Sequence, residues 1–444
     1  MTHRLNILIL YVSNQYPMRA TLWDQLYCFR RYSNHNCFYL NFSVRQVPWY
    51  LKKIKFDLIV FGTMFLATRV VGEWFKDPRK RALPLKSFDA LRIAFPQDEY
   101  LATDALSEFI NEFSIDRVFS LAPESEWPKI YDRLDTTRVK LSSVLPGYLD
   151  DETVARIEDL ARESATRDID IGYRTWRAAP NLGRHGFLRQ EIAEVFQAGA
   201  SKHNLKTDIS TRMEDTLWAD SWYKFLLRCK YTISVEGGAS VLDRDGSIKQ
   251  LTDAYLAEHA DASFAEVERA CFPGRDGELR YVAISPRHLE ACATRTCQVL
   301  IEGEYNHILM PGRHYVELKR DFSNLEDVLE IIRQDKVREE ITGNAYRDIV
   351  APGNYTYRGF VDQVLRESVA GLPAESSSKN SLLTTVIYQW MRVSDFLAWV
   401  QIALSLYELR AQARGKIRRL LVRLFSEGKV AALLRRFRRR NASC

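Results

Sequence analysis

Long apolar runs are missing from this 444-residue sequence, and so are the cysteine and histidine patterns of bound metals. Its seven cysteines form neither a CxxC pair nor an even set, which argues against a disulfide framework and suits a reducing cytoplasm. The eight histidines are scattered, without paired metal-ligand spacing. We therefore expect neither a metal site nor a bound cofactor.

Signals for a leader peptide or a membrane span are missing as well. The apolar stretch at residues 5–12 lacks a signal peptide's cleavage region and is expected to form a first buried strand. Near the other end, the uncharged runs 380–391 and 396–407 are twelve residues each. A helix needs about 20 apolar residues to cross a bilayer. The sequence thus predicts a cytoplasmic protein, at most peripheral at the inner face of the membrane.

Basic charge is concentrated at the C-terminal end. From residue 371 onward there are fourteen Lys/Arg and four Asp/Glu, a net charge of +10. Since the whole chain carries +6, subtracting this part leaves −4 for residues 1–370, so a nucleic-acid surface on the body is not expected. Residues 416–437 place apolar side chains opposite basic ones, which favours a helix lying on an anionic membrane surface. Packing on protein and binding of nucleic acid are the alternatives.

Short apolar runs alternate with helical patterns along most of the chain, which implies βαβ units and parallel sheets. The series runs from residue 5 to about 165 and then restarts at residue 168. We expect an α/β protein with two Rossmann-like doubly wound domains and a cleft between them. The expected divisions are a first domain at 1–165, a second at 166–370, a linker at 371–380 and a basic helical tail at 381–444.

The most informative segment covers residues 281–318. An apolar strand ends at Ile284, and Ser285 followed by Pro286 is a good helix-entry signal. The short helix carries Arg287 and Glu290 one turn apart, so that both side chains share a face. A helix N-terminus at the carboxyl end of a strand readily binds a nucleotide phosphate.

Two stretches, SPRHLEACATRTCQVLIEGEY (285–305) and CKYTISVEGGASVLDRDGSI (229–248), carry a family resemblance that extends over about residues 91–362. They resemble the nucleotide-sugar half of GT-B glycosyltransferases, specifically the spore-maturation-protein CgeB-like family. The resemblance implies a second domain that binds a UDP- or GDP-type sugar donor and a first domain that receives an unidentified acceptor. It assigns Glu290 to the ribose hydroxyls. Retaining relatives carry a further glutamate eight positions earlier, where this chain has Val282.

Further candidates come from their positions at strand ends. Arg287 and Arg174 would neutralise the donor's diphosphate, although each is equally suited to a salt bridge. Two glycines after a strand let a ligand approach the backbone closely. The expected donor-binding set is therefore Arg174, Glu236, Gly237, Gly238, Arg287, Glu290 and Glu304.

Two carboxylate motifs complete the candidates. Asp98 follows a strand of the first domain and is a candidate base for the acceptor hydroxyl, with a loop or capping carboxylate as the alternative. The stretch DRDG at 243–246 is reminiscent of a DxD metal motif, but Asp-Gly is foremost a turn dipeptide. We therefore favour a metal-independent enzyme.

Other functions remain open at this point. A nucleotide-sugar-binding or assembly protein at the membrane surface that lacks catalysis would carry the same donor motifs. A GT-B-type epimerase is a second alternative. A phosphorylase is disfavoured, because we find no signature of a lysine that holds pyridoxal phosphate.

Overall fold

A computed structural model describes residues 4–163, 166–369 and 382–424, with side chains up to Tyr407. The first domain contains a parallel six-stranded sheet in the order β2-β1-β3-β4-β5-β6. The strands β1 and β3 are fully buried and consist mainly of apolar residues, which is typical of a sheet covered on both faces. The strands are β1 (Asn6–Tyr11), β2 (Asn36–Asn41), β3 (Leu58–Phe61), β4 (Leu91–Ala94), β5 (Arg117–Ser120) and β6 (Lys140–Ser143).

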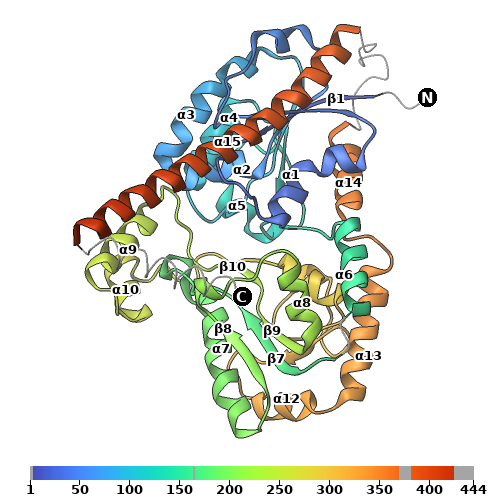
Figure 1. Ribbon diagram of the computed structural model, residues 1–444, viewed down its shortest axis with the longest axis vertical. Coiled ribbons are helices and arrows are strands. Elements are labelled where there is room, and N and C mark those ends of the chain that lie inside the picture. Colours follow the sequence, from blue (N-terminus) through green and yellow to red (C-terminus); the bar gives the residue numbers. More distant parts are fainter. Residues whose placement is uncertain (1–3, 164–165, 370–381, 425–444) are drawn as a thin grey trace.

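The second domain contains a parallel five-stranded sheet in the order β13-β12-β9-β7-β8, beside a two-stranded antiparallel ribbon, β10-β11. Both large sheets are doubly wound, and the predicted fold class is confirmed. Figure 1 shows the two domains one above the other. The strands are β7 (Ile169–Arg174), β8 (Thr207–Ser210), β9 (Cys229–Ser234), β10 (Gly237–Ala239), β11 (Tyr281–Ala283), β12 (Cys297–Ile301) and β13 (Val316–Leu318).

Helices connect the strands and cover the sheets. In the first domain they are α1 (Ala20–Tyr32), α2 (Thr63–Leu66), α3 (Gly72–Ala82), α4 (Thr103–Glu112), α5 (Trp127–Ile130) and α6 (Asp151–Glu163). The second series is α7 (Gly183–Lys202), α8 (Asp220–Arg228), α9 (Ser247–Glu258), α10 (Phe264–Cys271), α11 (Pro286–Ala293), α12 (Leu325–Ile332), α13 (Asp335–Ala345), α14 (Tyr357–Val369) and α15 (Leu382–Leu424).

One predicted helix cap is wrong. The sequence predicts a capping box from Ser323 to Glu326, but α12 begins after Asn324 and has no side-chain cap. The Asn324 side chain accepts a hydrogen bond from the Lys319 amide at 2.9 Å and donates to the Glu317 carbonyl at 3.0 Å. These contacts tie the loop to β13, and the loop geometry overrides the local capping signal.

Helix α14 returns the chain to the first domain. Its buried residues Tyr357, Phe360, Val361 and Val364 belong to the same apolar core as the first sheet. The chain therefore crosses between the two domains twice: once near the expected division at residue 165, and again where α14 returns to the first domain.

A buried polar cluster around Glu99 also joins the domains. The carboxylate accepts hydrogen bonds from the Ser120 hydroxyl at 2.5 Å, the Leu121 amide at 2.8 Å and the Tyr131 hydroxyl. From the second domain, the Tyr281 hydroxyl donates to it at 3.2 Å. Beside this cluster, the backbone of Asp243 pairs with that of residues 100–102 across the interface. These contacts join the two domains at this point of their interface.

The long helix α15 runs along the outside of the first domain and is drawn in red in Figure 1. Its inner face packs on β2 and the neighbouring loop through residues such as Ile387, Met391 and Trp399. Within the described residues, no helix combines the length and apolarity needed to cross a membrane. The amphipathic face predicted at 416–437 lies outside the residues whose side chains are described.

Asp395 fixes α15 to the body. Its carboxylate accepts hydrogen bonds from the Tyr11 hydroxyl at 2.7 Å and the Tyr27 hydroxyl at 2.9 Å, with Arg30 at 3.4 Å. Burial, reinforced by Asp395, raises the pKa of both tyrosines, so the hydroxyls stay protonated and donate. Trp399 adds a 2.7 Å hydrogen bond to the Tyr27 hydroxyl.

We predict that Asp395→Ala lowers the free energy of unfolding by about 1–3 kcal/mol, because it leaves buried tyrosine hydroxyls without their acceptor. The control is Arg392→Ala on the exposed side of the same helix, with an expected effect within about 0.5 kcal/mol. Chemical denaturation measures both. Equal stabilities for the two variants would show that the Asp395 contacts do not fasten the helix.

Candidate active site

A cavity of about 490 Å³ lies between the domains, at the carboxyl ends of β7 and β9. These two strands are neighbours in the sheet. From β7 the chain passes to β8 on one side, and it then crosses to β9 on the other side of β7. Such a reversal of strand order is where open α/β sheets bind ligands. From the first domain, residues 19–21 after β1 and Gln97 after β4 line the opposite wall.

The predicted helix entry at Ser285 is confirmed. Its hydroxyl accepts a hydrogen bond from the Arg287 amide at 3.3 Å, and Pro286 is the first residue of α11. Arg287 and Glu290 both line the cavity, as their spacing predicts. The Arg287 guanidinium donates to the Arg174 carbonyl at 2.6 Å and lies 5.5 Å from the centre of the Trp222 ring.

Glu290 is nearly buried, with 8% of its surface exposed. Its carboxylate accepts a hydrogen bond from Trp222 Nε1 at 2.8 Å. Burial raises the pKa of Glu290 from 4.5 to about 7, against the opposing effects of the Trp222 hydrogen bond and the Arg287 charge. The group therefore changes its protonation state near neutral pH, which makes its environment chemically sensitive to a ligand.

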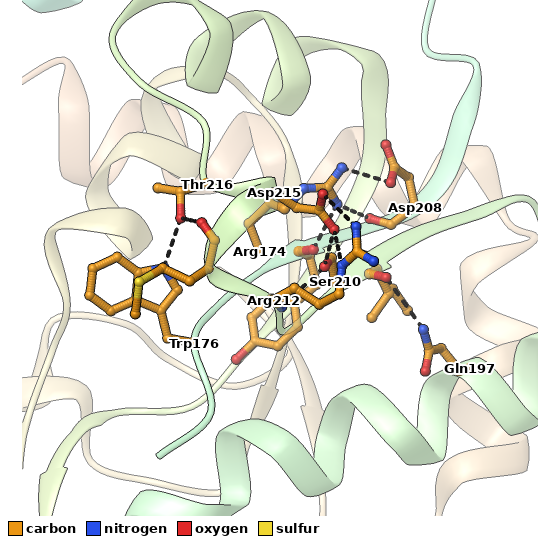
Figure 2. Close-up of polar contacts among 11 residues, drawn as sticks. Arg174, Trp176, Gln197, Asp208, Ser210, Arg212, Asp215 and Thr216 are labelled. Atoms are coloured by element: carbon orange, nitrogen blue, oxygen red, sulfur yellow. Dashed lines mark hydrogen bonds and ion pairs between the residues drawn. The ribbon is translucent and has the colours of Figure 1, made fainter. Parts of the chain in front are cut away.

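Arg174 lines the same cavity, but its guanidinium is engaged with β8. It donates to the Asp208 carboxylate at 2.7 Å and to the Asp208 carbonyl at 2.8 Å, as Figure 2 shows. The ring of Phe225 lies 4.5 Å from the guanidinium carbon. These contacts make Arg174 a link between neighbouring strands. Of the two roles that the sequence left open for this residue, the structure shows the salt bridge.

Arg189 is a cation of this cavity that the sequence reasoning missed. It lies on α7, the helix that follows β7, and is half-buried in the cavity wall. No hydrogen-bond or ion-pair partner of Arg189 occurs among the residues that the structure describes. The sequence signal that could have identified Arg189 is its position, two turns into the helix that follows the first strand of the domain. The geometry makes it better suited than Arg174 to meet an anion.

Aromatic side chains form another part of the wall. Trp176 and Trp218 flank Arg19 of the first domain, whose guanidinium carbon lies 4.7 Å and 5.2 Å from their ring centres. Trp176 Nε1 donates to the Thr216 hydroxyl at 2.8 Å (Figure 2). The same loop is held by Asp215, which accepts hydrogen bonds from Ser210 and Arg212. No local motif joins these residues, and only the fold brings them together.

Glu236 and the two following glycines have distinct positions. Glu236 and Gly237 line the cavity, but the Glu236 carboxylate accepts a hydrogen bond from the Tyr305 amide at 2.6 Å, and burial raises its pKa. Gly238 lies in β10 at φ 147, where a Cβ atom would be 1.8 Å from the Tyr281 carbonyl oxygen. The close approach of β10 and β11 thus requires this glycine.

Two other predicted residues do not reach the cavity wall. Glu304 forms an ion pair with Arg280 at 2.8 Å. Asp98 has a positive φ of 52, and its carboxyl is hydrogen-bonded to Tyr100 and faces Arg69. Burial raises the pKa of Asp98. Its neighbour Gln97, rather than Asp98, lines the cavity.

The carboxylate of Asp243 is occupied by the start of α9. It accepts hydrogen bonds from the amides of Gly246 at 2.9 Å, Ile248 at 3.3 Å and Lys249 at 2.8 Å. This is a turn and helix-capping role, as the Asp-Gly signal predicts. Among the described residues, no group of three or more His, Cys, Asp or Glu side chains is placed to hold a metal ion.

Comparison with known proteins finds similarity in structure. No family model matches the sequence, and no curated protein matches it. HepE from Anabaena, solved with UDP and glucose, has a TM-score of 0.47 and 11% identity, covering 83% of this chain and 100% of its own. A glycosyltransferase from Rickettsia africae has a TM-score of 0.48 and 8% identity, with coverages of 84% and 100%. At these values the similarities assign neither a family nor a substrate, and membership of the CgeB-like family stays a prediction.

We predict that Glu290→Gln removes a pH dependence of stability. Because the folded-state pKa of Glu290 is raised, its contribution to stability is fully present below about pH 4.5 and is lost as the pH rises to about 7. Over this pH range, the free energy of unfolding of the wild type should fall by up to about 3 kcal/mol relative to that of Glu290→Gln.

Denaturant unfolding at a series of pH values measures this difference. The matched control is Glu302→Gln, which removes an exposed carboxylate of the same domain. Parallel pH profiles for wild type and Glu290→Gln would contradict the raised pKa.

Proposed function

We propose that the protein is a glycosyltransferase that binds a nucleoside diphosphate sugar in the cavity between the domains. One observation carries the proposal: the cavity lies where strand order reverses, and α11 presents Arg287 and Glu290 to it. Doubly wound domains bind nucleotides at such points, with phosphates near a helix N-terminus. In this proposal, the acceptor binds at the facing wall from the first domain.

In this proposal the donor lies along the second domain. Glu290 accepts hydrogen bonds from the ribose hydroxyls, since an ionised carboxylate facing two vicinal hydroxyls is a strong and specific acceptor. Arg189 and Arg287 neutralise the diphosphate. Gly237, which lines the cavity without a side chain, allows the sugar to approach the backbone.

The transfer itself follows from this placement. The acceptor hydroxyl attacks the anomeric carbon, the bond from that carbon to the diphosphate oxygen breaks, and the hydroxyl proton passes to the departing diphosphate or to water. Positioning of the two substrates and neutralisation of the departing diphosphate supply the catalysis. The proposal does not use Asp98 as the base, because its carboxyl is hydrogen-bonded to Tyr100 and faces Arg69.

We predict that Glu290→Ala weakens donor binding by about 1.5–3 kcal/mol, the cost of losing hydrogen bonds to a charged group. Arg189→Gln should weaken binding of the nucleoside diphosphate but leave binding of the nucleoside unchanged. Calorimetric titration with UDP-, GDP- and dTDP-sugars and their nucleosides measures both effects.

Two variants serve as controls for these titrations. Arg184→Gln changes an exposed arginine on α7 whose partners are Glu268 and Asp276, and Glu302→Ala removes an exposed carboxylate. Both should bind the donor as the wild type does. If Glu290→Ala also binds normally while folding correctly, the ribose assignment fails.

We further propose that transfer needs no divalent cation, because both carboxylates of the DxD pattern, Asp243 and Asp245, accept hydrogen bonds from amides at the start of α9. Release of nucleoside diphosphate from a bound donor should therefore continue in EDTA. Activity lost in EDTA and restored by manganese or magnesium would overturn this. A protein that binds donors but releases no nucleoside diphosphate with any acceptor tested would instead be a binding protein.

A further inference from the structure

Helix α15 has an apolar outer face as well as an apolar inner one. The inner face is covered by the first domain, through Asp395 and Trp399. On the opposite side, seven large apolar side chains are each 45–65% exposed: Leu383, Val386, Trp390, Val393, Phe396, Leu397 and Leu404. Soluble surfaces expose such residues singly, whereas a continuous row of them marks an interaction surface.

The row is long and has almost no charge. From Leu383 to Tyr407 the exposed apolar residues recur every three or four positions, so they share one side of the helix. At about 1.5 Å per residue, this stretch is about 36 Å long. Arg392 is the one charged residue that is exposed on α15 between residues 382 and 407.

Aromatic and basic residues of the first domain extend the surface. Trp390 Nε1 donates to the Tyr50 hydroxyl at 3.2 Å, and the neighbouring Trp49 is 72% exposed. Lys53 lies over the Trp49 ring at 5.1 Å, and Lys52 beside it is exposed too. Tryptophans with nearby lysines are typical of the boundary between acyl chains and lipid headgroups.

Charge distinguishes the candidate occupants. The chain that follows, residues 408–444, contains twelve Lys/Arg and two Asp/Glu in its sequence. An anionic lipid surface attracts such a segment. A second copy docked in parallel on the same face would bring two segments of the same charge together, which costs free energy.

We propose that the outer face of α15 is a lipid-docking surface, which lies in the plane of an anionic membrane and buries its apolar row at the headgroup boundary. Because α15 is fastened to the first domain, the whole domain rests on the bilayer. The proposal does not depend on nucleotide-sugar binding. It differs from attraction by the basic tail alone, because the contact itself is apolar.

Vesicle flotation tests the proposal with the full-length protein and phosphatidylcholine vesicles, with and without phosphatidylglycerol. The test variant carries Val393→Gln, Phe396→Gln and Leu404→Gln. The matched control carries Trp74→Gln, Met213→Gln and Leu251→Gln, three exposed apolar residues of other elements. Circular dichroism and thermal melting verify that both variants are folded.

We expect the wild type and the control to bind anionic vesicles with equal affinity. The affinity of the test variant should be lower by about tenfold or more. In about 1 M salt, where the Debye length falls to about 3 Å, the wild type should retain part of its binding. A second measurement leaves the helix of the wild type unaltered. Brominated lipids should quench the tryptophan fluorescence of the wild type, and they should quench the fluorescence of Trp390→Phe to a smaller extent.

Other outcomes overturn the proposal. Equal binding by the test variant, or complete release by salt without any quenching, would assign the attraction to the basic segment alone. Failure of the wild type to bind any vesicle would exclude the lipid surface. If light scattering then shows a dimer that the test variant dissociates, the occupant is a second copy of the chain.

Discussion

The buried carboxylate of Glu99 is the interaction on which the geometry of the cleft depends. A carboxylate removed from water is costly unless hydrogen-bond donors replace its hydration. Burial raises the pKa of Glu99, while the hydrogen bonds from Ser120, Tyr131 and Leu121 and the charge of Arg69 act against that shift. A further donor, Tyr281, comes from the other domain. Separation of the domains would break the hydrogen bond from Tyr281, so this contact favours the joined arrangement.

Much of the fold could be predicted from sequence because parallel strands are buried on both faces. Their apolar runs, such as those of β1 and β3, are continuous and end in polar residues. Exceptions are the edge strands β6, with the sequence KLSS, and β8, with the sequence TDIS, which have no such run. Likewise, the apolar residues of α15 could not be divided into inner and outer faces, since both faces are apolar.

The candidate site was only partly predictable, and the arginines show the reason. Arg174 and Arg189 are chemically identical; Arg174 is the last residue of β7, and Arg189 lies two turns into α7. Arg174 is engaged by Asp208, which lies on the adjacent strand β8, whereas Arg189 has no such partner among the described residues. Partners of this kind depend on strand order, which local patterns do not contain. In contrast, the shared direction of Arg287 and Glu290 could be predicted, because Ser285 and Pro286 fix the start of their helix and the two residues are one turn apart. The role of Glu290 at the ribose came from the family resemblance.

Glu290, which we propose to bind the ribose, also shows how a buried carboxylate can be unfavourable for folding. Its carboxylate is nearly buried, and the Trp222 hydrogen bond and the Arg287 charge only partly offset the lost hydration, as the raised pKa shows. Additional donors would stabilise the ionised form. Ribose hydroxyls are donors of the right kind, and a ligand that supplies them would lower the pKa of Glu290 and release part of the burial cost on binding. Under the proposed function, the local cost of folding would become part of the affinity for the sugar donor, while the contacts around Glu99 and α15 would supply the stability that tolerates this cost.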